Sequence, residues 1–75
     1  MADPHDMTIS DAAALGATVR ALRRAQGLTQ EELGLAAGTG RRFIGDLERG
    51  KPTCRLGEAL AVLAALGARL RLEVE

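Results

Sequence analysis

The sequence predicts an all-α protein, a bundle of four to five short helices followed by a single β-strand at the C-terminus. Over most of the chain, apolar residues recur at helical spacing between capping residues and glycines. Residues 68–75 instead alternate strictly between apolar and charged side chains, which is typical of a half-buried strand. A chain of 75 residues has room for only one hydrophobic core, so we expect these elements to pack into one unit.

The first helix is expected over residues 10–26. Ser10 is a favoured N-cap residue, Asp11 places a negative charge in the first turn, and Gly27 is a suitable left-handed stop. The residues before it contain proline and show no periodicity, which indicates a flexible lead-in over residues 1–9. The apolar residues at helical spacing in this helix are Leu15, Val19 and Leu22.

The second helix is expected over residues 30–37. Thr29 and Glu32 form the Thr-x-x-Glu pattern of a capping box, and Gly38 ends the helix. So short a helix is marginal alone and must be held by its neighbours. The residues expected to face inward are Leu33, Ala36 and Ala37.

Two more helices are expected over residues 41–49 and 56–66. Gly50 and Gly67 follow them directly and are suitable terminators. The residues expected to be buried are Ile44 and Leu47 in the earlier helix, and Leu56, Leu60, Leu63 and Leu66 in the later one.

The strand predicted over residues 68–75 has no partner within the chain, so its backbone amides and carbonyls need a second copy of the protein. An antiparallel register about a two-fold axis at Leu72 places Arg71 opposite Glu73 of the second copy. Opposite charges facing each other across strands stabilise a sheet by roughly 0.2–1 kcal/mol per pair. The alternative is a frayed terminus whose alternation is accidental. The residues expected in this homodimer contact are Arg69, Leu70, Arg71, Leu72, Glu73 and Val74.

The charge of the chain is zero in total but unevenly distributed. Residues 20–55 contain eight Lys and Arg against four Asp and Glu, whereas residues 1–19 contain three acids and no Lys or Arg. A basic centre of this kind is typical of a surface that faces phosphates.

Several classes of protein are excluded or disfavoured by composition. The single cysteine, Cys54, excludes an internal disulfide and suits a reducing compartment. No apolar run reaches the ~20 residues that span a bilayer, and no signal-peptide pattern is present. The one histidine, His5, lies in the lead-in, and no acid–base constellation or phosphate loop accompanies it. We therefore expect a cytoplasmic protein that is not an enzyme, with no cofactor, no metal and no membrane partner.

Two adjacent arginines, Arg41 and Arg42, open the third predicted helix after a Gly-Thr-Gly break. The first turn of a helix prefers negative charge, so neither arginine gains local stability there. Two short helices joined by a tight turn form a helix-turn-helix, whose second helix enters the major groove and reaches base edges with its first residues. An arginine that grips guanine O6 and N7 together gives about 1–3 kcal/mol of discrimination. Residues 29–50 are therefore predicted to be a DNA-binding motif.

The stretch LTQEELGLAAGTGRRFIGDLERGK resembles the core of the Cro/repressor-type (XRE) helix-turn-helix family, and the likeness extends over residues 15–67. It implies a lambda-repressor-like bundle that binds an inverted-repeat operator in double-stranded DNA. The strand after residue 67 is similar to that of the HipB-type antitoxins. In that group, paired terminal strands form a dimer that represses its own operon and binds a HipA-like kinase toxin.

The resemblance also implies roles for single residues. Gln30 matches a glutamine that contacts the DNA backbone, and Arg41 and Arg42 match the base-reading positions. Asp46, one turn further on, is expected to orient Arg42 or to accept from cytosine N4. The residues expected to bind DNA are Gln30, Thr39, Arg41, Arg42, Asp46, Arg49 and Lys51, and those expected to form a structural ion pair are Arg23 and Glu48.

Four positions qualify the resemblance. Gly34 replaces the usual alanine where the motif helices cross; both are small, so close approach is expected to survive. Thr39 replaces an apolar turn residue and either loosens the turn or offers its hydroxyl to a phosphate. Gly40 replaces a Ser-type N-cap and is a tolerable cap. Phe43 is the only aromatic residue, which favours duplex DNA over single strands and indicates a packing role.

The sequence thus predicts a lead-in at residues 1–9, a DNA-binding domain at residues 10–67 and a dimerisation strand at residues 68–75. Its function is predicted to be that of a dimeric repressor, the antitoxin of a toxin–antitoxin module. Two alternatives stay open. One is a stand-alone or phage-type repressor, and the other is a protein-interaction module that has kept the fold without binding DNA.

Overall fold

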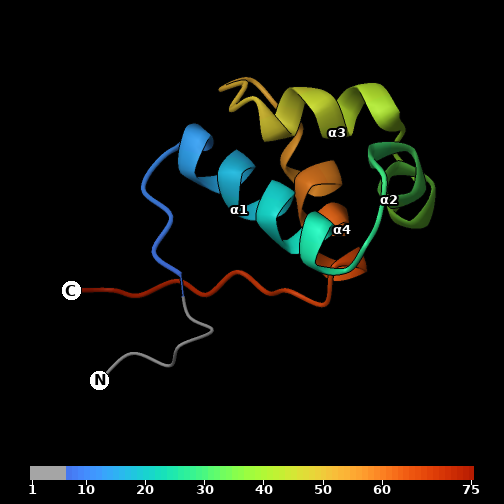
Figure 1. The fold of residues 1–75 in the computed structure, drawn as a ribbon. Helices are drawn as coiled ribbons and strands as arrows, with labels where there is room; N and C mark the ends of the chain where they lie inside the picture. Colours follow the sequence, from blue (N-terminus) through green and yellow to red (C-terminus); the bar gives the residue numbers. More distant parts are fainter. Residues whose placement is uncertain (1–6) are drawn as a thin grey trace.

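The computed structural model describes residues 7–75, which form a bundle of four helices with no strand in that range (Figure 1). The α2 and α3 helices pack against each other, α3 also lies against α1, and α2 also lies against α4. The predicted all-α bundle is confirmed, with four helices. Their bounds are Ala12–Ala25 for α1, Gln30–Ala37 for α2, Arg41–Glu48 for α3 and Leu56–Ala65 for α4.

The starts of α1 and α2 are fixed by side-chain caps. The prediction of Ser10 as the first cap is wrong, because the carboxylate of Asp11 accepts from the backbone N–H of Ala14 at 2.7 Å and makes Asp11 the N-cap. The capping box before α2 is confirmed. The N–H of Glu32 donates to Thr29 Oγ1 at 3.0 Å, and the N–H of Thr29 donates to Glu32 Oε1 at 2.9 Å.

The core joins all four helices, and it differs from the prediction at two places. On α4, Leu56 and Leu60 are exposed, with 67% and 42% of their surface accessible, whereas Leu63 and Leu66 are buried as predicted. Ala59 and Val62 complete the buried face of this helix. On α2, Ala36 is also exposed. The buried apolar residues are Val19, Leu33, Ile44, Leu47, Ala59, Val62, Leu63 and Leu66.

Two glycines let backbones approach closely. A Cβ added at Gly16 of α1 would lie 2.2 Å from the carbonyl oxygen of Leu47, so α1 and the end of α3 meet without a side chain between them. A Cβ added at Gly34 would lie 2.6 Å from the carbonyl carbon of Gly40. The close approach expected at this crossing is therefore present, and this backbone leaves no room for a methyl group at Gly34.

The C-terminal segment at residues 68–75 leaves the end of α4 as an extended chain (Figure 1). Ala68 packs against the core and Leu70 is 50% exposed, whereas Leu72 and Val74 are each 94% exposed, so the apolar side of the alternation is uncovered toward its end within the described residues. The strand pairing between two copies therefore stays a prediction. Of the predicted lead-in, residues 7–9 belong to no helix, and His5 lies outside the described residues.

Candidate nucleic-acid interface

The turn between α2 and α3 gives the motif its shape. Gly38 ends α2 in the left-handed conformation at φ 71°, which is accessible to glycine at little cost. The N–H of Thr39 then donates to the carbonyl oxygen of Gly34 at 2.9 Å, and α3 begins directly after Gly40. The two helices are thus joined by only three residues, as a helix-turn-helix requires.

The first turn of α3 has an unusual electrostatic character. Its N-cap residue, Gly40, offers no side-chain hydrogen bond, and no acidic residue lies in the turn. The α2 helix, by contrast, has both a capping box and two acids in its first turn. Arg41 and Arg42 are exposed, and within residues 7–75 neither has an ion-pair partner. Two cations without an acidic partner in the described residues therefore lie at the positive end of the helix dipole.

A buried network fixes how α3 is held. Arg23 Nε donates to Glu48 Oε2 at 2.6 Å and Arg23 Nη2 donates to Glu48 Oε1 at 3.0 Å, so the pair is bidentate. Arg23 Nη1 donates to the carbonyl oxygen of Leu28 at 2.8 Å. Gln30 Nε2 adds a hydrogen bond to Glu48 Oε1 at 3.1 Å. The network ties α1 and the start of α2 to the end of α3, which sets the angle at which α3 is presented.

The network also perturbs ionisation. Burial alone would raise the pKa of Glu48, but the hydrogen bonds from Arg23 and Gln30, with the charges of Arg23 and Arg20, outweigh it and hold the pKa below its ordinary value. The hydrogen bond to Glu48 raises the pKa of Arg23. Both groups are therefore charged at neutral pH, and their charges neutralise each other inside the fold.

Asp46 is the other acid of α3, and it does not contact Arg42. Its Oδ1 accepts from Arg49 Nη2, and its Oδ2 lies 3.7 Å from Lys51 Nζ. The expectation that Asp46 orients Arg42 is therefore wrong for this structure. Arg49 lies three residues beyond Asp46 at the end of α3 and reaches it through helical spacing. Lys51 comes within reach because the chain turns back at Gly50, which has φ 80°.

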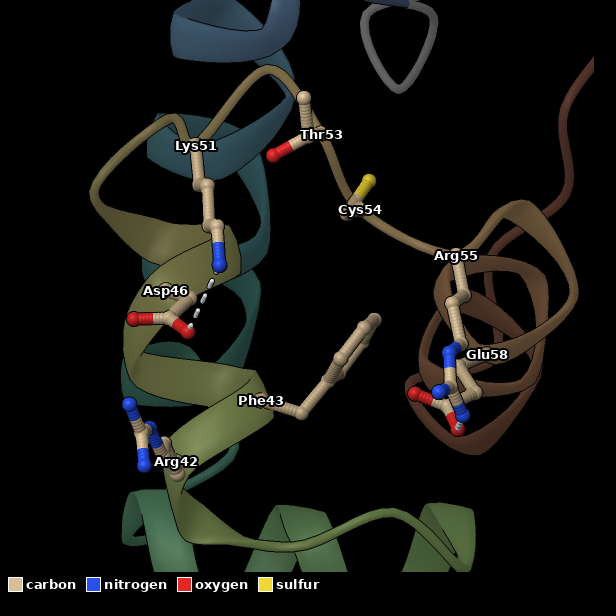
Figure 2. Close-up of a pocket in the computed structure, with 8 residues that line it drawn as sticks. All are labelled: Arg42, Phe43, Asp46, Lys51, Thr53, Cys54, Arg55 and Glu58. Carbon is tan, nitrogen blue, oxygen red and sulfur yellow. Dashed lines mark hydrogen bonds and ion pairs between the residues drawn. The ribbon is translucent and has the colours of Figure 1, made fainter.

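Phe43 projects from α3 toward the segment before α4 (Figure 2). It is half-buried and packs against the core, which agrees with the packing role predicted for it. Beside it lies an open hollow of about 270 Å³ between α3 and the start of α4. The hollow is lined by Arg42, Phe43, Asp46, Lys51, Thr53, Cys54, Arg55 and Glu58.

Thr39 presents its hydroxyl to the protein rather than to solvent. Its Oγ1 is buried and has no hydrogen-bond partner in the part of the chain that the structure describes. A phosphate contact from this hydroxyl would need a rotation about its χ1 angle. The interpretation that Thr39 loosens the turn fits the structure better, because an unpaired buried hydroxyl costs stability.

The sequence matches the helix-turn-helix family over residues 19–72, which is most of the chain. The chain belongs to the XRE-type helix-turn-helix family. It is also 52% identical over 59 residues to an uncharacterised HTH-type transcriptional regulator, y4mF, of Sinorhizobium fredii, covering 79% of this chain and 78% of that protein. As a family member it is a transcriptional regulator with a DNA-binding fold, not an enzyme.

Two solved structures of other proteins superimpose closely on this chain. The complex of HipB with an O4 20mer gives a TM-score of 0.84 at 22% identity, covering 92% of this chain and 97% of HipB. The restriction-modification controller protein C.AhdI from Aeromonas hydrophila gives 0.71 at 36% identity, covering 79% of this chain and 86% of that one. The arrangement of the four helices is therefore shared with both solved proteins.

Some features of this family member were invisible in its sequence. Gln26 Nε2 donates to the carbonyl oxygen of Leu66 at 2.8 Å and ties the ends of α1 and α4 together. This bond has no local signal, because it joins residues 40 positions apart. Arg55 also pairs with Glu58 at 3.5 Å at the start of α4, and this i,i+3 contact is of the kind that local spacing can indicate.

Residues 7–75 offer neither a cluster of metal ligands nor a helix suited to a bilayer. Over this range no group of three or more His, Cys, Asp or Glu side chains gathers closely enough to hold a metal ion. None of the helices there combines the length and apolar character needed to cross a membrane.

Proposed function

We propose that the chain is a sequence-specific repressor that binds double-stranded DNA in the cytoplasm through the first turn of α3. The observation that carries this proposal is the pair of exposed arginines, Arg41 and Arg42, which have no ion-pair partner among residues 7–75 and lie at the uncapped start of that helix. The first turn of α2, by contrast, carries Glu31 and Glu32, the charge that stabilises the start of a helix. Phosphates and guanine edges supply the acceptors that the first turn of α3 lacks.

The other predicted contacts surround this centre. Arg49 and Lys51 follow α3 and are exposed, which suits contact with phosphates beside the groove. Gln30 lies at the start of α2, and its side chain donates a hydrogen bond to Glu48 at the end of α3. Its proposed role is therefore to fix the orientation of α3 beside the DNA backbone. Binding by Arg41 and Arg42 then supplies base discrimination of about 1–3 kcal/mol for each bidentate pair.

The repressor is proposed to be a homodimer in which residues 68–75 of two copies pair as antiparallel strands about Leu72. In support, the apolar residues of the segment are exposed in one copy, and Arg71 and Glu73 lie 3.8 Å apart on its charged side. Pairing would satisfy the backbone amides and carbonyls of both segments, bring their apolar side chains side by side, and replace this contact with two contacts between copies. Two reading helices related by a two-fold axis would need an inverted-repeat operator.

The biological role is proposed to be that of an antitoxin, which represses its own operon and neutralises a HipA-like kinase toxin. Support comes from the fold shared with HipB, which has been solved in a HipA–HipB–O2–O3 complex, over 92% of this chain. A stand-alone regulator is the second candidate. The higher identity to the controller protein C.AhdI, 36% against 22% for HipB, favours it.

Selection from random duplex DNA with the purified protein tests DNA reading. We expect an inverted repeat to be enriched, and its spacing to report the distance between the two reading helices. Replacing Arg41→Ala and Arg42→Ala together should abolish the enrichment, whereas Arg24→Ala, on exposed α1 surface, should leave it intact. Absence of any enriched sequence, with residual binding lost at moderate salt, would refute the repressor proposal.

A charge swap tests the dimer. The variant Arg71→Glu should place like charges opposite each other and shift the protein toward monomer in sedimentation equilibrium, and adding Glu73→Arg should restore the dimer. Equal mass for all three proteins would refute the strand pairing. Co-expression with the product of a neighbouring kinase-like gene, followed by co-purification, separates the antitoxin from the stand-alone regulator.

A further inference from the structure

Asp46 holds two of the cations that the proposed function assigns to DNA phosphates. Its carboxylate accepts from Arg49 and lies 3.7 Å from Lys51 Nζ, a contact drawn in Figure 2. The backbone supports the same arrangement, because the N–H of Lys51 donates to the carbonyl oxygen of Asp46 at 3.1 Å and folds the loop back onto α3. Asp46 is thus an internal counter-ion for both cations.

The interface therefore contains two kinds of cation. Arg49 lies back along α3, since a Cβ added at Gly45 would stand 3.3 Å from Arg49 Nη1. Arg41 and Arg42, at the other end of the same helix, have no ion-pair partner in the described part of the chain. The base-reading cations are free, while the phosphate-facing cations are occupied by Asp46.

We propose that Asp46 is a specificity-determining residue, which suppresses sequence-independent DNA binding by competing with phosphates for Arg49 and Lys51. The inference rests on the proposed function, because it assumes that α3 faces DNA. Non-specific binding is driven almost wholly by phosphate contacts and the counterions they release, so an acid that occupies two cations weakens it directly. Operator binding also draws on Arg41 and Arg42, which Asp46 does not touch, and so loses a smaller share of its affinity.

The variant Asp46→Asn tests this, because it keeps the shape of the side chain and removes its charge. Affinity for a random-sequence duplex, measured by fluorescence anisotropy, is expected to rise about 8-fold at 0.1 M salt for each additional phosphate that the variant neutralises. The slope of log affinity against log salt should steepen by about 0.9 per additional phosphate, up to about 1.8 per protomer. Affinity for the selected operator should rise less, so the ratio of operator to random affinity falls.

Glu58→Gln is the matched control. Glu58 lines the same hollow as Asp46, pairs with Arg55 at 3.5 Å, and its replacement removes the same unit of charge. Random-duplex affinity should change little in this variant. A second control carries Arg49→Gln and Lys51→Gln, and adding Asp46→Asn to that protein should then have no effect.

Three results would overturn the proposal. Unchanged random-duplex affinity in Asp46→Asn would show that the cations are not withheld, and an equal rise in Glu58→Gln would assign the effect to net charge. A loss of operator affinity with altered base preference would make Asp46 a base-reading residue instead. If the wild-type protein enriches no operator, the proposed function is refuted. The affinity of Asp46→Asn for random duplex can still be measured in that case, because this measurement needs no operator. Circular dichroism checks folding, and Asp46→Ser repeats the test if Asp46→Asn is unfolded.

Discussion

Replacing Glu48→Gln should remove a large part of the stability of this small protein. The side chains of Arg23 and Glu48 are only 11% and 4% exposed, and the guanidinium makes two of its three hydrogen bonds to this carboxylate. Without the charge, a buried Arg23 would keep only the carbonyl oxygen of Leu28 as a strong acceptor. Removing one partner of a buried pair costs about 3–5 kcal/mol, and glutamine retains one acceptor, so we expect about 3 kcal/mol.

That cost is large for a chain of this size. A folded chain with 0.05–0.15 kcal/mol per residue has a free energy of unfolding of roughly 4–11 kcal/mol here. A loss of about 3 kcal/mol lowers the melting temperature by roughly 12–24 °C. Urea titration followed by circular dichroism measures the loss directly, and the operator affinity of the still-folded fraction reports whether α3 has kept its orientation.

The exposed pair of Arg55 and Glu58 provides the comparison. These side chains are 85% and 38% exposed, so Glu58→Gln should cost less than about 1 kcal/mol. The replacement Arg23→Met with Glu48→Leu removes both charges together and should cost less than Glu48→Gln alone, because no buried ion is left unpaired. If Glu48→Gln lowered the free energy of unfolding no more than Glu58→Gln does, the conclusion that the Arg23–Glu48 network holds α3 in place would be wrong.

The remaining predictions concern pH, packing and capping. Folding lowers the pKa of Glu48 from its ordinary 4.5, so the charged carboxylate stabilises the fold above pH 4.5 and this stabilisation is lost as pH falls through the lowered value. The difference in free energy of unfolding between wild type and Glu48→Gln should therefore become smaller below pH 4.5, as measured in acid titrations. Gly16→Ala should destabilise by about 1–3 kcal/mol in urea titration because its methyl would meet backbone. Gly57→Ala should be neutral or stabilise by up to about 1 kcal/mol, because a Cβ added at Gly57 has no atom within 4 Å. If Gly16→Ala and Gly57→Ala changed the free energy of unfolding equally, the close approach of α1 and α3 would be contradicted. Asp11→Ala should lower the free energy of unfolding by about 0.5–2 kcal/mol, because α1 loses its N-cap. Ser10→Ala should lower it by less, because Ser10 does not cap the helix.

Local signals in the sequence were sufficient to predict the four helices and the helix-turn-helix motif. The capping box at Thr29 and the left-handed glycine at Gly38 act through residues three or four positions away, so their effect is readable from the sequence alone. The arginines that open α3 were readable for the same reason, since their conflict with the helix dipole is local. These features determined the fold class and the end of α3 that is proposed to face DNA.

Packing and side-chain partnerships were decided only by the tertiary structure. The buried face of α4 was predicted only in part, because periodicity identified Leu63 and Leu66 but did not distinguish the exposed Leu56 and Leu60 from the buried Ala59 and Val62. The partner of Asp46 was mispredicted because the chain reverses after α3 and brings Lys51 back, a path that depends on the turn at Gly50. Whether position 34 has room for a methyl group could be decided only from the tertiary structure, which places the carbonyl group of Gly40 beside Gly34. Sequence determines what each turn of the chain can do, whereas contacts between distant segments depend on distances that exist only after the helices have packed.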